Sequence, residues 1–136
     1  MKYEQIKEGV EYGDLQSLVK NIVSIAEFEP KTGTEDEVVV VGFYVDDESP
    51  AQDLGTFLER GVAEILDTEV SPNPDDEGYY MVFVEVDNNE NLMTNVFEML
   101  LDTERLTGIT NWTLKFYNGV EKTITTEQIK AWLKRN

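Results

Sequence analysis

The sequence predicts an α+β fold: a ferredoxin-like split β-α-β sandwich with an antiparallel sheet, an added N-terminal helix, and an added C-terminal hairpin and helix. First, residues 37–45 and 79–87 are apolar runs rich in β-branched and aromatic residues, which favour buried strands. Second, apolar residues recur at helical spacing after each run, over 50–60 and 90–106. Third, the six elements within 37–117 follow the order β-α-β, β-α-β. We expect the two apolar runs to form the centre of a four-stranded antiparallel sheet, with both helices on one face.

A chain of 136 residues is expected to form one domain, residues 1–136. Within it, residues 1–36 should form an N-terminal arm and helix, and residues 118–136 a C-terminal strand and helix. Asp14 is a candidate N-cap for a helix over 14–28. The apolar stripe of this helix would consist of Leu15, Leu18, Val19, Ile22, Ile25 and Ala26.

Local signals set the boundaries of the first β-α unit. Gly42 interrupts the first apolar run and indicates a bulge or a close approach of another segment. Ser49 is the expected N-cap of the helix that follows, and Gln52 would close a capping box with it. Gly61 should end this helix, and a weaker, charged strand is expected over 62–70.

Similar signals set the boundaries of the C-terminal part. Gly108 should end the second helix, because glycine tolerates the left-handed conformation that often follows a helix. Asn118-Gly119 is a strong hairpin signal between strands expected over 111–117 and 120–125. A second capping box, from Thr125 to Gln128, should begin the last helix.

The composition excludes several classes of function. The chain has no cysteine, so thiol catalysis, disulfides and thiolate metal sites are excluded. It also has no histidine, and therefore no Ser-His or Cys-His pair and no imidazole zinc site. No apolar run approaches the length of about 20 residues that spans a membrane, and the N-terminus lacks the apolar region of a secretory signal. We predict no catalytic residue and no cofactor.

The net charge of −17 is unevenly distributed. Residues 27–104 contain 22 acidic residues against Lys31 and Arg60, whereas residues 105–136 contain six basic residues and only two acidic ones. The negative charge of residues 27–104 should repel nucleic acid and anionic membranes and favour basic partners. Solubility or life at high salt would also explain the acidity.

Two acidic loops are the candidate metal-binding residues. Asp46, Asp47 and Glu48 follow the first apolar run, and Asp75, Asp76 and Glu77 precede the second. In an antiparallel pair these loops would approach one another, and carboxylate oxygens are the ligands that calcium and magnesium prefer. Acidic residues also cap helices and solvate turns, and no EF-hand spacing is present. A carboxylate pair for acid–base catalysis is a further alternative.

The sequence does not favour direct binding of nucleic acid. Ferredoxin-like sheets often bind RNA through exposed aromatic residues. The aromatic candidates are Phe43, Tyr79, Phe83, Phe116 and Tyr117. No basic surface accompanies them on the central strands, so a covered sheet is the better interpretation. The acidic middle could instead mimic the phosphate charge of DNA and occupy a basic groove.

The C-terminal helix supplies the candidate interaction residues. Trp132 is either an aromatic anchor for a protein partner or a plug of the core. Lys130, Lys134 and Arg135 would give the outer face of this helix a positive charge. The opposite charges of the acidic middle and the basic end could pair head-to-tail between copies.

Two segments carry a resemblance to a known family. They are Asp53 to Gly61 (DLGTFLERG) and, above all, Asp67 to Glu85, with VSPNP, an acidic turn and YMVFVE. Residues 37–88 resemble an uncharacterised protein family of T4-like tailed phages of marine cyanobacteria. The resemblance implies a phage origin, brings no catalytic residue, and suggests a virion or assembly component in the host cytoplasm or the virion.

From these observations we expect a non-enzymatic acidic phage protein that acts by protein–protein contacts, with a protein partner or a second copy of itself. A DNA-mimic inhibitor of a host nucleic-acid-binding protein and a carboxylate-metal-dependent enzyme are the alternatives. We expect no membrane association and no secretion.

Overall fold

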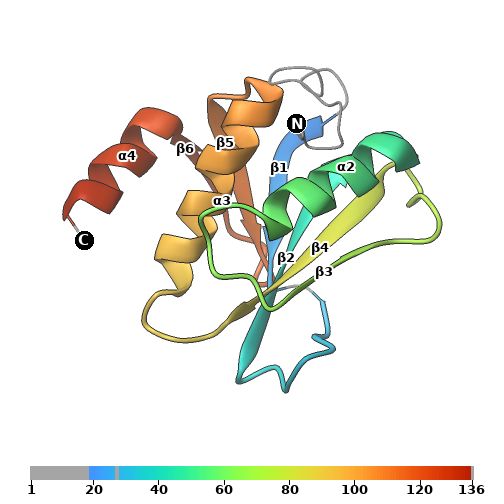
Figure 1. Ribbon diagram of the computed structural model, residues 1–136, viewed down its shortest axis with the longest axis horizontal. Helices are drawn as coiled ribbons and strands as arrows, with labels where there is room; N and C mark the ends of the chain where they lie inside the picture. Colours follow the sequence, from blue (N-terminus) through green and yellow to red (C-terminus); the bar gives the residue numbers. More distant parts are fainter. Residues whose placement is uncertain (1–18, 27, 136) are drawn as a thin grey trace.

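The computed structural model describes residues 19–26 and 28–135, and in this part of the chain a six-stranded sheet packs with three helices (Figure 1). The strands are β1 (Val19–Ile25), β2 (Val38–Val45), β3 (Asp67–Val70), β4 (Tyr80–Asp87), β5 (Asn111–Phe116) and β6 (Glu121–Thr125). The helices are α2 (Glu48–Glu59), α3 (Leu92–Thr107) and α4 (Thr126–Arg135). The α+β class predicted from the sequence is confirmed.

The strand order is β3-β4-β2-β1-β5-β6. The two apolar runs pair along their whole length as β2 and β4, antiparallel, from Val38 opposite Asp87 to Val45 opposite Tyr80. The expectation of a four-stranded, purely antiparallel sheet is wrong, because β1 pairs with β5 in parallel. The ferredoxin-like order is not confirmed, since β1 lies between β2 and β5.

The helix predicted over residues 14–28 is wrong where the structure describes it, because residues 19–25 form strand β1. Residues 14–18, including the expected N-cap Asp14, lie outside the described residues, as does residue 27. The apolar spacing suits a helix, but tertiary pairing on both edges of β1 decides the structure. Val23 pairs with Phe43 on one side and with Leu114 on the other, and its side chain is fully buried.

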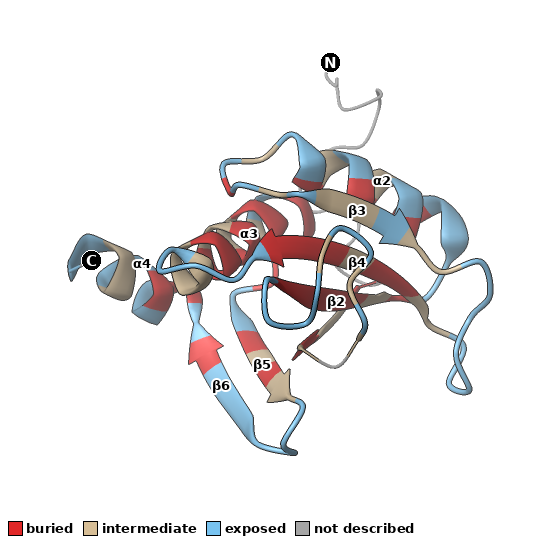
Figure 2. Cartoon of the chain, turned by 90° about the horizontal axis from the view of Figure 1, so that it is seen from below, coloured by how far each residue is buried: buried red, intermediate tan, exposed pale blue. Residues whose placement is uncertain are grey.

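The core lies between the sheet and the helices α2 and α3, which cover the same face of the sheet (Figure 1). Alternate residues of β2 and β4 point into this core, and Figure 2 shows both strands largely buried. They are Val39, Val41, Phe43, Val45, Val82, Val84 and Val86. Trp112 of β5 and Leu100 of α3 are fully buried in the same core. Such side chains contribute roughly 1.5–3 kcal/mol each to the stability of the fold.

Two of the predicted helix boundaries are confirmed and one is corrected. Gly108 ends α3 in the left-handed conformation, with φ 78°. Thr125 and Gln128 form a capping box at the start of α4: the Thr125 N–H donates to Gln128 Oε1 at 2.9 Å, and the Gln128 N–H donates to Thr125 Oγ1 at 3.2 Å. The N-cap of α2 is Asp47 instead of Ser49, because the Asp47 carboxylate accepts a hydrogen bond from the Glu48 N–H.

The strand expected over 62–70 begins only at Asp67. The segment before it is a loop that is bonded to buried polar side chains of α3. Asp102 Oδ2 accepts a hydrogen bond from the Val62 N–H at 2.9 Å, and Asn95 Oδ1 accepts one from the Glu64 N–H at 3.2 Å. These bonds satisfy backbone donors that have no partner strand here, because β4 ends at Asp87.

Candidate interaction surfaces

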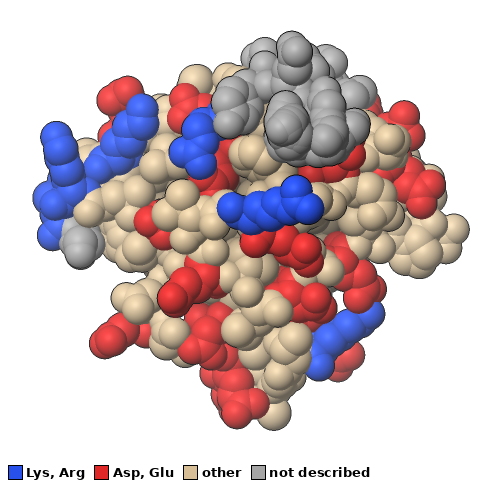
Figure 3. All heavy atoms as spheres, in the orientation of Figure 1, with Lys and Arg blue, Asp and Glu red and all other residues tan. Residues whose placement is uncertain are grey.

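The two ends of the long axis of the molecule carry opposite charges. In Figure 1, helix α4 lies at one end, and the two acidic loops, at the start of α2 and before β4, lie at the other. Figure 3 shows basic side chains gathered at the α4 end, whereas acidic side chains are spread over the rest of this face. The basic residues of the C-terminal part therefore also lie together in space, at the end opposite the two acidic loops.

The acidic loops lie at the same edge of the sheet, as predicted, because Val45 at the end of β2 pairs with Tyr80 at the start of β4. Residues 46–48 and 75–77 are all exposed. Among residues 19–26 and 28–135, no three acidic side chains lie close enough together to hold a metal ion.

Several of these acidic side chains stabilise local structure. Asp47 caps α2, and Asp75 Oδ1 accepts hydrogen bonds from the Glu77 and Tyr79 N–H groups, each at 2.9 Å. Lys20 of β1 donates to Glu77 at 3.3 Å, and its ammonium lies 4.5 Å from the centre of the Tyr79 ring. The side-chain carboxylates of Asp46, Glu48 and Asp76 make no hydrogen bond or ion pair with the described part of the chain, so they are free for a partner.

Helix α4 combines an apolar inner face with a basic outer face. Ile129 is fully buried, and Trp132 is half-buried with its ring edge-on to Phe97 of α3 at 5.0 Å. Trp132 thus packs in the contact between α3 and α4 and stays partly exposed. Lys130, Lys134 and Arg135 are exposed.

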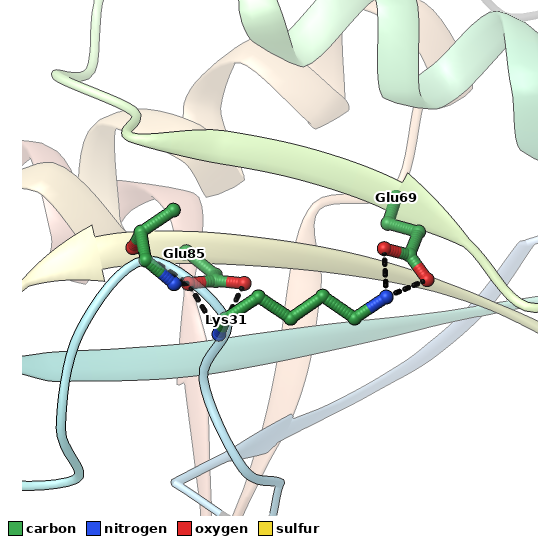
Figure 4. Close-up of polar contacts among 4 residues, drawn as sticks. Lys31, Glu69 and Glu85 are labelled. Atoms are coloured by element: carbon green, nitrogen blue, oxygen red, sulfur yellow. Dashed lines mark hydrogen bonds and ion pairs between the residues drawn. The ribbon is translucent and has the colours of Figure 1, made fainter.

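A buried carboxylate on the helix-free face of the sheet is a feature that our reading of the sequence missed. Glu85 of β4 has 6% of its surface exposed. Its Oε1 accepts hydrogen bonds from the Thr32 N–H at 2.9 Å and Thr32 Oγ1 at 2.7 Å, and both oxygens accept from the Lys31 N–H at 3.0 Å (Figure 4). The side chain of Lys31 extends away to pair with Glu69 of β3. In the sequence, the only indication of this site is a glutamate, Glu85, within an otherwise apolar run of residues.

The surroundings of Glu85 determine its ionisation. Burial raises the pKa of this carboxyl, but the hydrogen bonds from Thr32 and Lys31, with the charge of Lys31, outweigh burial and hold the pKa below its ordinary value. The hydrogen bond to Glu69 raises the pKa of the exposed Lys31 ammonium. Glu85 is therefore a carboxylate at neutral pH and fastens the loop before β2 across the sheet.

A pocket of about 540 Å³ opens beside this loop. Its walls come from the loop between β1 and β2, from the start of β2, and from Tyr117 after β5. The lining residues are Ala26, Phe28, Glu29, Glu35, Val38, Val39, Val40, Asn88 and Tyr117. None of them belongs to the residues that the sequence singled out as a site, although Tyr117 was among the aromatic residues considered for nucleic acid.

The other aromatic candidates do not form an exposed row. Phe43 is fully buried in the core, and Phe83 lies edge-on to Phe28 at 4.8 Å. Tyr79 lies edge-on to Tyr44 at 6.3 Å, whereas Tyr117 is 75% exposed. Phe28 also explains Gly42: a Cβ there would lie 2.9 Å from the Phe28 ring, so the glycine marks a close approach.

Comparisons of the chain with protein-family models, with curated proteins and with solved structures each find no match. Within residues 19–26 and 28–135, every helix is too short or too polar to cross a membrane.

Proposed function

We propose that this chain is a non-enzymatic phage protein that acts through protein–protein contacts, as a virion component or an assembly factor. The observation that supports this best is the separation of charge along the molecule, with acidic loops at one end and the basic face of α4 at the other. Complementary charges speed the encounter of two proteins and fix their relative orientation.

The contact that this separation favours is head-to-tail between copies. The basic end of one copy, with Lys134 and Arg135, would meet the free carboxylates of Asp46 and Asp76 on the next. A head-to-tail interface uses two different surfaces, so it builds a ring or an open filament. Both geometries are suited to a component of an assembly.

Sedimentation velocity of the full chain, at low and high salt, tests this contact. We expect concentration-dependent association at about 50 mM salt that is lost near 0.5 M, because a Debye length of roughly 10 Å at 0.1 M falls to about 3 Å at 1 M. A basic-end variant, Lys134→Glu with Arg135→Glu, and an acidic-end variant, Asp46→Lys with Asp76→Lys, should each stay monomeric.

The decisive measurement mixes the two variants. The unchanged acidic end of the first variant can meet the unchanged basic end of the second, and the two reversed ends also attract each other. Association should therefore be recovered in the mixture where neither variant associates alone. The matched control is Lys122→Glu on β6, an exposed basic residue away from α4, which should associate like the parent chain. A parent chain that stays monomeric at every concentration, or a mixture that does not recover association, would contradict the head-to-tail contact.

A further inference from the structure

The pocket beside the Glu85-bonded loop has an apolar floor and aromatic walls. Val38 and Val40 of β2 point to the helix-free face and are 4% and 2% exposed. Two aromatic residues, Phe28 and the exposed Tyr117, also line the pocket. Its volume of about 540 Å³ falls within the range of about 300–1,000 Å³ that is typical of pockets for small molecules.

The walls of this pocket are held in place by hydrogen bonds of the loop between β1 and β2. The Asn88 N–H donates to the Glu37 carbonyl at 2.8 Å, and the Asn88 amide nitrogen donates to the Asp36 carbonyl at 3.2 Å. Glu85 holds the other half of the same loop through Lys31 and Thr32. The pocket is therefore formed before a ligand enters, which lowers the entropic cost of binding.

The pocket carries negative charge that the described part of the chain does not neutralise. Glu29 and Glu35 line it, and within residues 19–26 and 28–135 neither carboxylate makes a hydrogen bond or an ion pair. No lysine or arginine is among the lining residues that the structure describes. Lys31, the nearest basic residue of the loop, is directed away to Glu69 (Figure 4).

The apolar floor, the aromatic rings and the carboxylates of this pocket together favour one kind of ligand. An apolar floor accepts an alkyl stem, aromatic rings attract a cation at their faces, and carboxylates bind guanidinium or ammonium groups. We propose that this pocket binds a basic side chain, an arginine or a lysine, presented by a partner protein. The pocket lies away from the acidic loops 46–48 and 75–77, so this site does not depend on the head-to-tail contact.

The test is a titration of the ¹⁵N-labelled full chain with N-acetyl-arginine amide, followed by NMR. It uses the Lys134→Glu, Arg135→Glu background, which removes the basic end as a competing ligand. We expect saturable shifts of the amides of Phe28, Asn88 and Tyr117. The uncharged isostere N-acetyl-citrulline amide should give no such shifts, because it keeps the shape of arginine without the charge.

Removing the two carboxylates should abolish the effect. Glu29→Gln with Glu35→Gln should weaken arginine binding about tenfold or more, given the strength of charge-assisted hydrogen bonds. Neither residue bonds to the described fold, so the spectrum should otherwise stay unchanged. The control pair Glu64→Gln with Glu98→Gln removes the same charge elsewhere and should bind like the parent.

Three results would overturn the proposal: equal binding of the citrulline compound, equal weakening by the control pair, or shifts that are absent from these three amides. Each of these leaves the sedimentation result untouched, so failure of this site and failure of the head-to-tail contact are distinguishable.

Discussion

Replacing Glu85 by glutamine should measure how strongly the loop before β2 is fastened to the sheet. The change keeps the size of the side chain and removes its charge. Glu85 serves three donors, the Lys31 N–H, the Thr32 N–H and Thr32 Oγ1, at distances from 2.7 to 3.0 Å. With the oxygen of glutamine in the Oε1 position, all three donors keep an acceptor.

The expected loss follows from the change in the strength of these bonds. Hydrogen bonds to a charged acceptor contribute about 1.5–3 kcal/mol, against about 0.5–1.5 kcal/mol for neutral ones. If each of the three hydrogen bonds weakens by about 1 kcal/mol, the loss of unfolding free energy is at most about 3 kcal/mol. Water can reach part of this loop, so we expect Glu85→Gln to lower the free energy of unfolding by about 1–2 kcal/mol.

Urea unfolding followed by tryptophan fluorescence measures this loss, since Trp112 is fully buried and Trp132 is half-buried. Hydrogen exchange at the Lys31 and Thr32 amides reports the loop itself and should become faster in the variant. The control is Glu69→Gln, which removes the exposed partner of the Lys31 ammonium and should change stability little.

The reasoning would be refuted by a Glu85→Gln variant whose unfolding free energy and whose exchange at residues 31 and 32 both match the parent. It would also be refuted if Glu69→Gln had the larger effect, because the exposed ion pair would then hold the loop.

Three further predictions test the same framework. The folded state lowers the pKa of Glu85, so the charged carboxylate adds its full stabilisation above the ordinary pKa of 4.5 and loses it as the pH falls through the lower folded-state pKa. In urea titrations, the difference in unfolding free energy between the parent and Glu85→Gln should therefore shrink below pH 4.5. Gly61→Ala should lower the free energy of unfolding by about 2 kcal/mol in the same assay, because its Cβ would clash with the Asp102 carboxylate that binds the Val62 N–H; an unchanged midpoint would contradict this packing. Gly108→Ala should cost about 1 kcal/mol in thermal unfolding, because φ at this position is 78°; equal stability would mean that the turn relaxes freely.

The elements predicted correctly are those whose signals are local. The apolar runs of β2 and β4, the glycine after α3 and the capping box of α4 each specify structure within a few residues. Strand β1 was mistaken for a helix because its apolar residues also fit helical spacing. Its true state depends on two partner strands that only the tertiary structure brings together.

The site was predicted less well for the same reason. Glu85 and its donors Lys31 and Thr32 are separated by 54 and 53 residues, so no local pattern connects them. The acidic loops were correctly placed at one edge of the sheet, but Asp47 and Asp75 bond to neighbouring backbone groups, which the sequence offered as the alternative to metal binding. The pocket depends on Tyr117, which lies far along the chain from Glu29 and Glu35.

The position of β1 has a consequence for how the chain reaches its folded state. Ser24 pairs with Lys115, so the sheet is complete only when an early segment meets a late one. During synthesis the outer edge of β1 has to wait for β5, and until then β1 presents an unpaired edge rich in β-branched residues, which favours aggregation. Contacts so distant in sequence also slow folding, because the loop must close before the pairing contributes. We expect this domain to fold after most of its chain has been made, with the β5–β6 hairpin as the last part to join.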